Sequence, residues 1–159
     1  MSNKKRIEYL KSRGIPQDME FSESRILQRD HIEEMKSYVD FQNHTEFHVS
    51  LPQCSEEEAK DEIFRSKEIL EKEYGLKIDS LSYPFGDYSD RDIKLLKAAG
   101  YKTGITVDFG YNDLKSNLYR LKRISLNDSG DVNEIIVRAT GLWAFFKEIS
   151  GKKIYGFKD

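Results

Sequence analysis

The chain has 159 residues, of which 38% are hydrophobic and 34% are charged, a composition that predicts one folded domain with a single core. Its 26 Lys and Arg nearly balance its 28 Asp and Glu, and the net charge of -2 offers no basic surface for a nucleic acid. Cys54 is the only cysteine, which excludes an internal disulfide and a structural zinc site built on cysteines.

The N-terminal residues are basic, but no apolar run follows them. This pattern predicts neither a signal peptide nor a membrane span, so we expect a cytoplasmic protein.

Hydrophobic periodicity predicts helices that alternate with short strands along the chain. In order, we expect a helix over 3–13, a loop over 15–28, a helix over 31–38, a strand over 39–43, a helix over 56–74, a strand over 78–83, a helix over 90–99, strands over 101–107 and 121–126, and a helix over 132–139. This alternation favours an α/β fold with largely parallel strands.

The helix over 56–74 has the clearest boundaries. Ser55 and Glu58 form a capping-box pattern at its start, and Gly75 marks its end. Its apolar stripe comprises Ala59, Ile63, Ile69, Leu70 and Tyr74. In the helices over 31–38 and 132–139 we expect these residues to face inward: Ile32, Met35 and Tyr38 in the first, and Val132, Ile135 and Ile136 in the second. The helix over 90–99 has the apolar residues Ile93, Leu95 and Leu96, and Gly100 closes it.

The three histidines are His31, His44 and His48. His44 and His48 are four residues apart, and their imidazoles can converge on one metal if the backbone curls between them. Thr45 occupies the position where a zincin protease requires glutamate, which excludes that class. Histidines at this spacing are also found as plain surface residues, so the spacing alone leaves both interpretations open.

The order of motifs adds context to the histidine pair. The run HTEFH from His44 to His48 is followed by a long helix, a YPFG turn, an AAGY run that ends at Tyr101, and an LKRI run that begins at Leu121. Over residues 30–126 this succession resembles the polysaccharide deacetylases (NodB-homology, carbohydrate esterase family 4). The YPFG form is similar to the branch that includes poly-N-acetylglucosamine deacetylases.

The resemblance implies a distorted (β/α) barrel and a metal-dependent hydrolase that removes N-acetyl groups from N-acetylglucosamine-type sugars or polysaccharides. It implies His44 and His48 as ligands of Zn²⁺ or another divalent metal, and a carbohydrate as the partner. Thr45 would fix the histidine turn through its hydroxyl or would be a small loop residue. The YPFG turn would form one wall of the sugar groove, and the alternative is a plain turn at the end of a strand. Its residues are Tyr83, Pro84, Phe85 and Gly86.

The family's first motif, a Thr-Phe-Asp-Asp run that supplies the base and a third metal ligand, does not occur in this sequence. No histidine follows His48 either, so the catalytic residues stay unidentified. We therefore expect a single domain over 1–159, truncated at its N-terminus relative to the family. It would form an incomplete barrel that lacks the first strand, and its open edge would favour a homo-oligomer.

For several other residues the sequence gives weaker indications of a catalytic or binding role. Asp87, Asp90, Asp108 and Glu46 are candidate replacement carboxylates, with Asp90 alternatively a helix cap and Asp87 and Asp108 alternatively loop residues. We expect His31 to lie outside the site and Cys54 to be a small buried residue. The aromatic residues expected to cover the core or stack on sugars are Trp143, Phe145 and Phe146. The rival hypothesis for the whole chain is an inactive deacetylase-like module that binds carbohydrate or regulates another protein.

Overall fold

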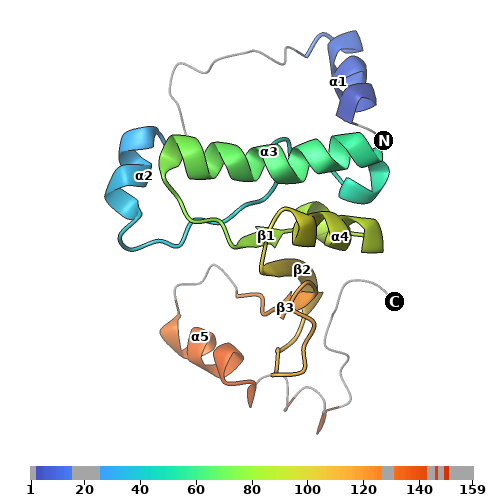
Figure 1. Ribbon diagram of the computed structural model, residues 1–159. Coiled ribbons are helices and arrows are strands. Elements are labelled where there is room, and N and C mark those ends of the chain that lie inside the picture. The colour runs from blue at the N-terminus through green and yellow to red at the C-terminus, as the bar shows by residue number, and fades with distance from the viewer. Residues whose placement is uncertain (1–2, 16–25, 127–130, 143–145, 147–148, 151–159) are drawn as a thin grey trace.

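The computed structural model describes residues 3–15, 26–126, 131–142, 146 and 149–150 (Figure 1). The elements are, in order, α1 (Asn3–Ser12), α2 (Arg29–Met35), a 3₁₀ turn η1 (Leu51–Gln53), α3 (Glu56–Tyr74), β1 (Ser80–Ser82), a 3₁₀ turn η2 (Pro84–Gly86), α4 (Asp90–Ala98), β2 (Thr103–Phe109), β3 (Leu121–Arg123) and α5 (Val132–Ala139). The loop expected over 15–28 falls mostly outside the described residues.

The described strands form one parallel sheet in the order β1-β2-β3. Ser80 pairs with Thr103 and Ser82 with Ile105, while Ile105 also pairs with Leu121 on the far side. Helix α4 connects β1 to β2, as parallel neighbours require. The predicted α/β fold with parallel strands is therefore confirmed.

The predicted strand over 39–43 is wrong except at its last residue. Only Asn43 is paired, in an isolated parallel bridge to Leu81. Val39 and Asp40 are exposed, and burial begins only toward Asn43, so the start of this segment has no buried face that would fix a longer strand. Tyr38, expected to face inward from the helix over 31–38, is 89% exposed. Likewise β1 covers Ser80–Ser82 and not the predicted 78–83. At its carboxyl end Pro84 lacks the N–H that would continue the ladder.

Helix α3 begins and ends where the sequence predicts. Ser55 Oγ accepts from the Glu58 amide at 3.2 Å, and Glu58 Oε2 accepts from the Ser55 amide at 2.9 Å. Gly75 closes the helix in the left-handed region, with φ 64°. Of the predicted stripe, Ala59 and Ile63 are fully buried, and two polar residues share their face, Glu62 and Ser66.

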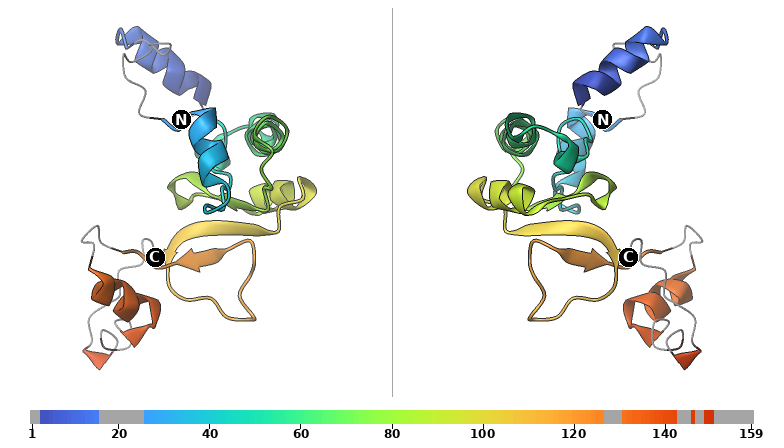
Figure 2. Two further views of the ribbon diagram at one scale, coloured as in Figure 1. Left: turned by 90° about the vertical axis from the view of Figure 1, so that its left-hand side faces the viewer. Right: turned by 90° about the vertical axis from the view of Figure 1, so that its right-hand side faces the viewer.

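The hydrophobic core lies where α3 and α4 pack on one side of the sheet (Figures 1 and 2). Its fully buried side chains include Leu51, Ile63, Ile78, Leu81 and Leu96. Of the apolar residues of α4, Ile93 and Leu96 are buried, while Leu95 is half-buried.

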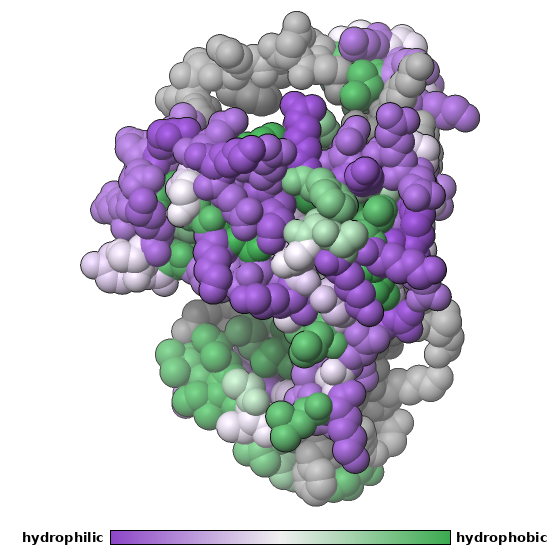
Figure 3. Space-filling view, in the orientation of Figure 1, coloured by the Kyte–Doolittle hydropathy of each residue, from purple (hydrophilic) through white to green (hydrophobic). Residues whose placement is uncertain are grey.

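Helix α5 lies below β3 in Figure 1, away from α3 and α4, and its predicted inward face is wrong (Figures 1 and 2). Val132, Ile135 and Ile136 are all exposed. The surface at the lower left of Figure 3, where α5 lies in the same orientation in Figure 1, is largely apolar. An amphipathic pattern predicts that the apolar face of a helix is buried. Within the described residues, no other segment covers the apolar face of α5.

Candidate functional site

The candidate site is built on the loop that follows Asn43. Asn43 pairs with β1, so the chain leaves the carboxyl edge of the sheet at His44, beside the carboxyl end of β1. Thr45 and His48 have φ of 67° and 50°, in the left-handed region that non-glycine residues rarely adopt. The curled backbone brings the two imidazole rings together, with centroids 4.8 Å apart and planes at 74°.

A backbone carbonyl fixes the tautomer of the neutral His44 ring. Its Nδ1 lies 2.7 Å from the Ser82 carbonyl oxygen, which can only accept. In the neutral ring Nδ1 therefore donates, and the lone pair is on Nε2. Metal-binding histidines in proteins commonly have this arrangement, in which the ring nitrogen opposite the metal donates to a carbonyl or carboxylate.

The YPFG turn meets the histidines through Phe85. The Phe85 ring lies edge-on to His48, with centroids 4.6 Å apart, and is 59% exposed. Phe85 and Gly86 both have positive φ, and a Cβ on Gly86 would lie 2.2 Å from Val107 Cγ2, so the turn requires glycine there. Tyr83 and Pro84 are buried beneath the turn, and the Tyr83 hydroxyl donates to the Tyr119 carbonyl at 3.0 Å.

A groove of about 770 Å³ runs along the carboxyl ends of the three strands, with Phe85 at one side. Its lining comes from the segment after β1, from the end of β2 and from the segment after β3: Phe85, Gly86, Asp87, Tyr88, Val107, Asp108, Phe109, Arg123, Ile124, Ser125 and Leu126. Ligands of open parallel sheets bind at this end of the strands.

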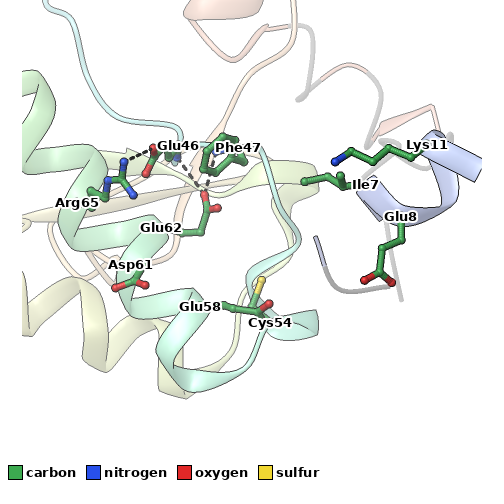
Figure 4. A pocket seen from close by; sticks show the side chains of 10 residues that line it. All are labelled: Ile7, Glu8, Lys11, Glu46, Phe47, Cys54, Glu58, Asp61, Glu62 and Arg65. Carbon is green, nitrogen blue, oxygen red and sulfur yellow. Dashed lines mark hydrogen bonds and ion pairs between the residues drawn. The ribbon is translucent and has the colours of Figure 1, made fainter. Parts of the chain in front are cut away.

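The candidate carboxylates lie in three places. Asp87 and Asp108 line the groove, and Asp87 accepts from the Ser50 hydroxyl at 3.2 Å. Asp90 instead pairs with Arg120 at 2.6 Å, and it is not the helix cap, because Ser89 caps α4. Glu46, on the histidine loop, pairs with Arg65 of α3 at 3.5 Å (Figure 4). Across the described ranges, no three or more His, Cys, Asp or Glu side chains form a metal-binding group.

Sequence reasoning missed the buried polar residues that hold the histidine loop. Asn43 Oδ1 accepts from the Thr45 amide at 2.9 Å, and Glu62 accepts from the amides of Glu46 and Phe47. The Thr45 hydroxyl is buried without a hydrogen-bond partner, so the turn is fixed through backbone amides and not through that hydroxyl. The available signal was the position of Glu62, three residues after Ala59 and beside Ile63 on the apolar stripe.

The remaining candidates lie apart from the histidine pair or outside the described residues. His31 accepts from the Gln28 amide at the start of α2. Cys54 is buried, as predicted, and burial raises the pKa of its thiol, which disfavours a nucleophilic thiolate. Phe146 is exposed, whereas Trp143 and Phe145 lie outside the described residues.

Known proteins share this sequence pattern and this fold. The sequence model of the polysaccharide deacetylase family matches residues 2–104. "Putative polysaccharide deacetylase YxkH" of Bacillus subtilis (strain 168) is 24% identical over 102 residues, which are 64% of this chain and 37% of that protein.

Two solved structures resemble the chain. The deacetylase PplD of Streptococcus pyogenes, in complex with acetate, has a TM-score of 0.67 and 26% identity over 74% of this chain and 52% of its own. BC0361, a polysaccharide deacetylase from Bacillus cereus, has a TM-score of 0.65 and 22% identity over 86% of this chain and 47% of its own. The chain thus spans about a third to a half of the length of these relatives.

The fold and the site together define an α/β protein with a histidine pair at the carboxyl edge of a parallel sheet. With the family match over residues 2–104, the chain belongs to the polysaccharide deacetylase family. The helices among the described residues are too short or too polar to cross a membrane.

Proposed function

We propose that the chain carries the histidine part of a metal-dependent site that removes N-acetyl groups from N-acetylglucosamine-type sugars or polysaccharides. The observation that supports this most directly is the contact of the His44 and His48 rings beside Phe85, with the lone pair of His44 on Nε2. Membership of the polysaccharide deacetylase family supports the type of reaction.

His44 and His48 fit a divalent metal such as Zn²⁺ as far as two donors can. The His44 tautomer is the one that a metal ligand needs, and both imidazoles are accessible. Catalytic zinc usually has three protein ligands, so we expect this pair alone to bind the ion weakly. A bound metal would polarise the acetamide carbonyl and lower the pKa of a coordinated water.

The chain's own residues would position the sugar. Phe85 presents an exposed ring that can stack on the apolar face of a sugar, supported from below by Tyr83 and Pro84. Asp87 and Asp108 line the groove, where their carboxylates can accept hydrogen bonds from sugar hydroxyls. We assign the role of catalytic base to neither of them.

We further propose that the three-stranded sheet is a section of the family's distorted barrel, within a single domain over 1–159. The similarity to PplD over 74% of this chain but 52% of that structure supports this. An open sheet edge presents unpaired backbone groups, so we expect the isolated chain to self-associate through it.

One observation favours a second candidate function, a carbohydrate-binding module without catalysis. The sequence has no Thr-Phe-Asp-Asp run, and the structure brings no third potential ligand to the histidine pair within the described residues. Such a module would retain the groove and the Phe85 ring and would not release acetate.

Acetate release separates the two functions. The chain is incubated with N-acetylglucosamine oligomers and Zn²⁺ or Co²⁺, and acetate is measured alongside oligomer binding. Release that His44→Ala abolishes supports the deacetylase. Binding without release supports the module, and the absence of both contradicts both functions.

A further inference from the structure

The loop between the two histidines is held in a conformation that its own sequence disfavours. Thr45 is β-branched, and its φ of 67° places the side chain against its own backbone. His48 is also in the left-handed region. Such residues persist only where the surrounding structure fixes them, so the contacts that hold this loop determine where both imidazoles lie.

Glu62 makes the central contact. It lies in the first half of α3, is 7% exposed, and directs its carboxylate toward the loop (Figure 4). A single oxygen, Oε2, accepts from the amides of both Glu46 and Phe47, each at 3.0 Å. Two consecutive amides can converge on one oxygen only when the backbone curls around it, as in an anion-binding nest.

Three other side chains also contact the loop. Asn43 Oδ1 accepts from the Thr45 amide at 2.9 Å, and Arg6 of α1 donates to the Phe47 carbonyl at 3.0 Å. Arg65, one turn of α3 after Glu62, pairs with Glu46 and is exposed. Glu62 therefore provides the buried contact to the centre of the loop, midway between His44 and His48.

We propose that Glu62 is a positioning residue for the His44 and His48 site: its Oε2 fixes the turn that sets the distance between the two imidazoles. The role in metal binding rests on the proposed function, whereas the role in holding the rings together does not. Glu62 itself faces the backbone of the loop and is not offered as a ligand.

Two substitutions of Glu62 distinguish the effect of the oxygen's position from the effect of the carboxylate charge. Glu62→Gln keeps an oxygen with two lone pairs where Oε2 lies, so it can still accept from both amides. Glu62→Asp keeps the charge but withdraws the oxygens by about one C–C bond, roughly 1.5 Å, beyond reach of the 3.0 Å contacts. A positioning role predicts that Gln is tolerated and Asp is not.

The test measures ring proximity and metal affinity on the full chain. NMR records cross-relaxation between the His44 and His48 ring protons and hydrogen exchange of the Glu46 and Phe47 amides, without metal. Calorimetry then measures Zn²⁺ affinity. The matched control is Ile63→Val, which removes one methyl group next in sequence on α3 and lowers stability without touching the loop contacts.

We expect Glu62→Asp to lose the ring cross-relaxation and the amide protection and to bind Zn²⁺ about 10–100-fold more weakly, as for other residues that orient metal ligands. In Glu62→Gln and Ile63→Val, the ring cross-relaxation, the amide protection and the Zn²⁺ affinity should stay close to those of the parent chain. Retained ring contacts in Glu62→Asp, or loss of them in the control, would overturn the proposal. If the parent chain binds no Zn²⁺, the metal part of the proposed function fails, and the ring contacts still decide the role of Glu62.

Discussion

Replacement of Asn43 by alanine should destabilise the chain more than its position in a loop suggests. Asn43 is 2% exposed, and its amide nitrogen donates to the Ser66 hydroxyl at 2.7 Å and to the Tyr101 hydroxyl at 2.5 Å. Its oxygen accepts from the Thr45 amide. The side chain thus ties the start of the histidine loop to α3 and to the segment before β2.

The size of the expected loss in unfolding free energy depends on which polar groups the substitution leaves without hydrogen-bond partners. In Asn43→Ala the hydroxyls of Ser66 and Tyr101 keep their bonds to the carbonyls of Glu62 and Ile63. The partly buried Thr45 amide loses its acceptor, and a donor left unsatisfied away from water costs about 1–3 kcal/mol. We expect a loss of about 2 kcal/mol, or roughly 4–8 °C in Tm for a chain of this size.

Urea unfolding followed by circular dichroism measures this loss, with the m-value unchanged if only stability is affected. Tyr101→Phe is the comparison, because it removes one hydroxyl while Asn43 keeps Ser66 and Thr45 as partners. We therefore expect a smaller loss of unfolding free energy, about 1 kcal/mol. A loss below roughly 0.5 kcal/mol in Asn43→Ala, the range of surface substitutions, would refute the reasoning.

Three further predictions concern packing, capping and pH. Gly104→Ala should cost about 1–3 kcal/mol in urea unfolding, because its Cβ would lie 2.4 Å from the Tyr83 hydroxyl; an unchanged midpoint would contradict this. Ser55→Ala should cost about 1 kcal/mol and Ser55→Gly only a few tenths, since it is the N-cap of α3; equal losses would argue against capping. Burial raises the pKa of Tyr101 to about 12, so the folded state holds this proton more tightly than the unfolded one. The resulting stability is complete below about pH 10 and should fall between about pH 10 and 12, by roughly 2–3 kcal/mol. Stability curves of Tyr101→Phe should lack this part of the alkaline decline, and identical curves would contradict it.

The parts of the fold that sequence reasoning predicted well depend on local interactions. The Ser55 capping box and the Gly75 stop each involve residues within about one helical turn, so the pattern contains the whole interaction. Strand lengths depend on partners that are distant in sequence. That is why the segment 39–43 was predicted as a strand although only Asn43 is paired.

The same distinction applies to the site. The spacing of His44 and His48 predicted that the rings could converge, and the structure brings their centroids within 4.8 Å. Their assignment as metal ligands stays a prediction. The supporting residues could not be found from spacing, because Glu62 reaches the loop across 15–16 positions and Asn43 reaches Tyr101 across 58. The prediction that Val132, Ile135 and Ile136 of α5 face inward was wrong. Periodicity identifies the apolar face of a helix, but it does not show whether another part of the protein covers that face.

The most direct test of the central claim is a calorimetric titration of the metal-stripped chain with Zn²⁺, repeated on His44→Ala, His48→Ala and the control His31→Ala. His31 is a histidine on α2 outside the site, so its loss should leave binding unchanged. We predict one site that either His44→Ala or His48→Ala abolishes. Absence of binding in the parent chain, or binding that survives both substitutions, would contradict a metal centre on this histidine pair.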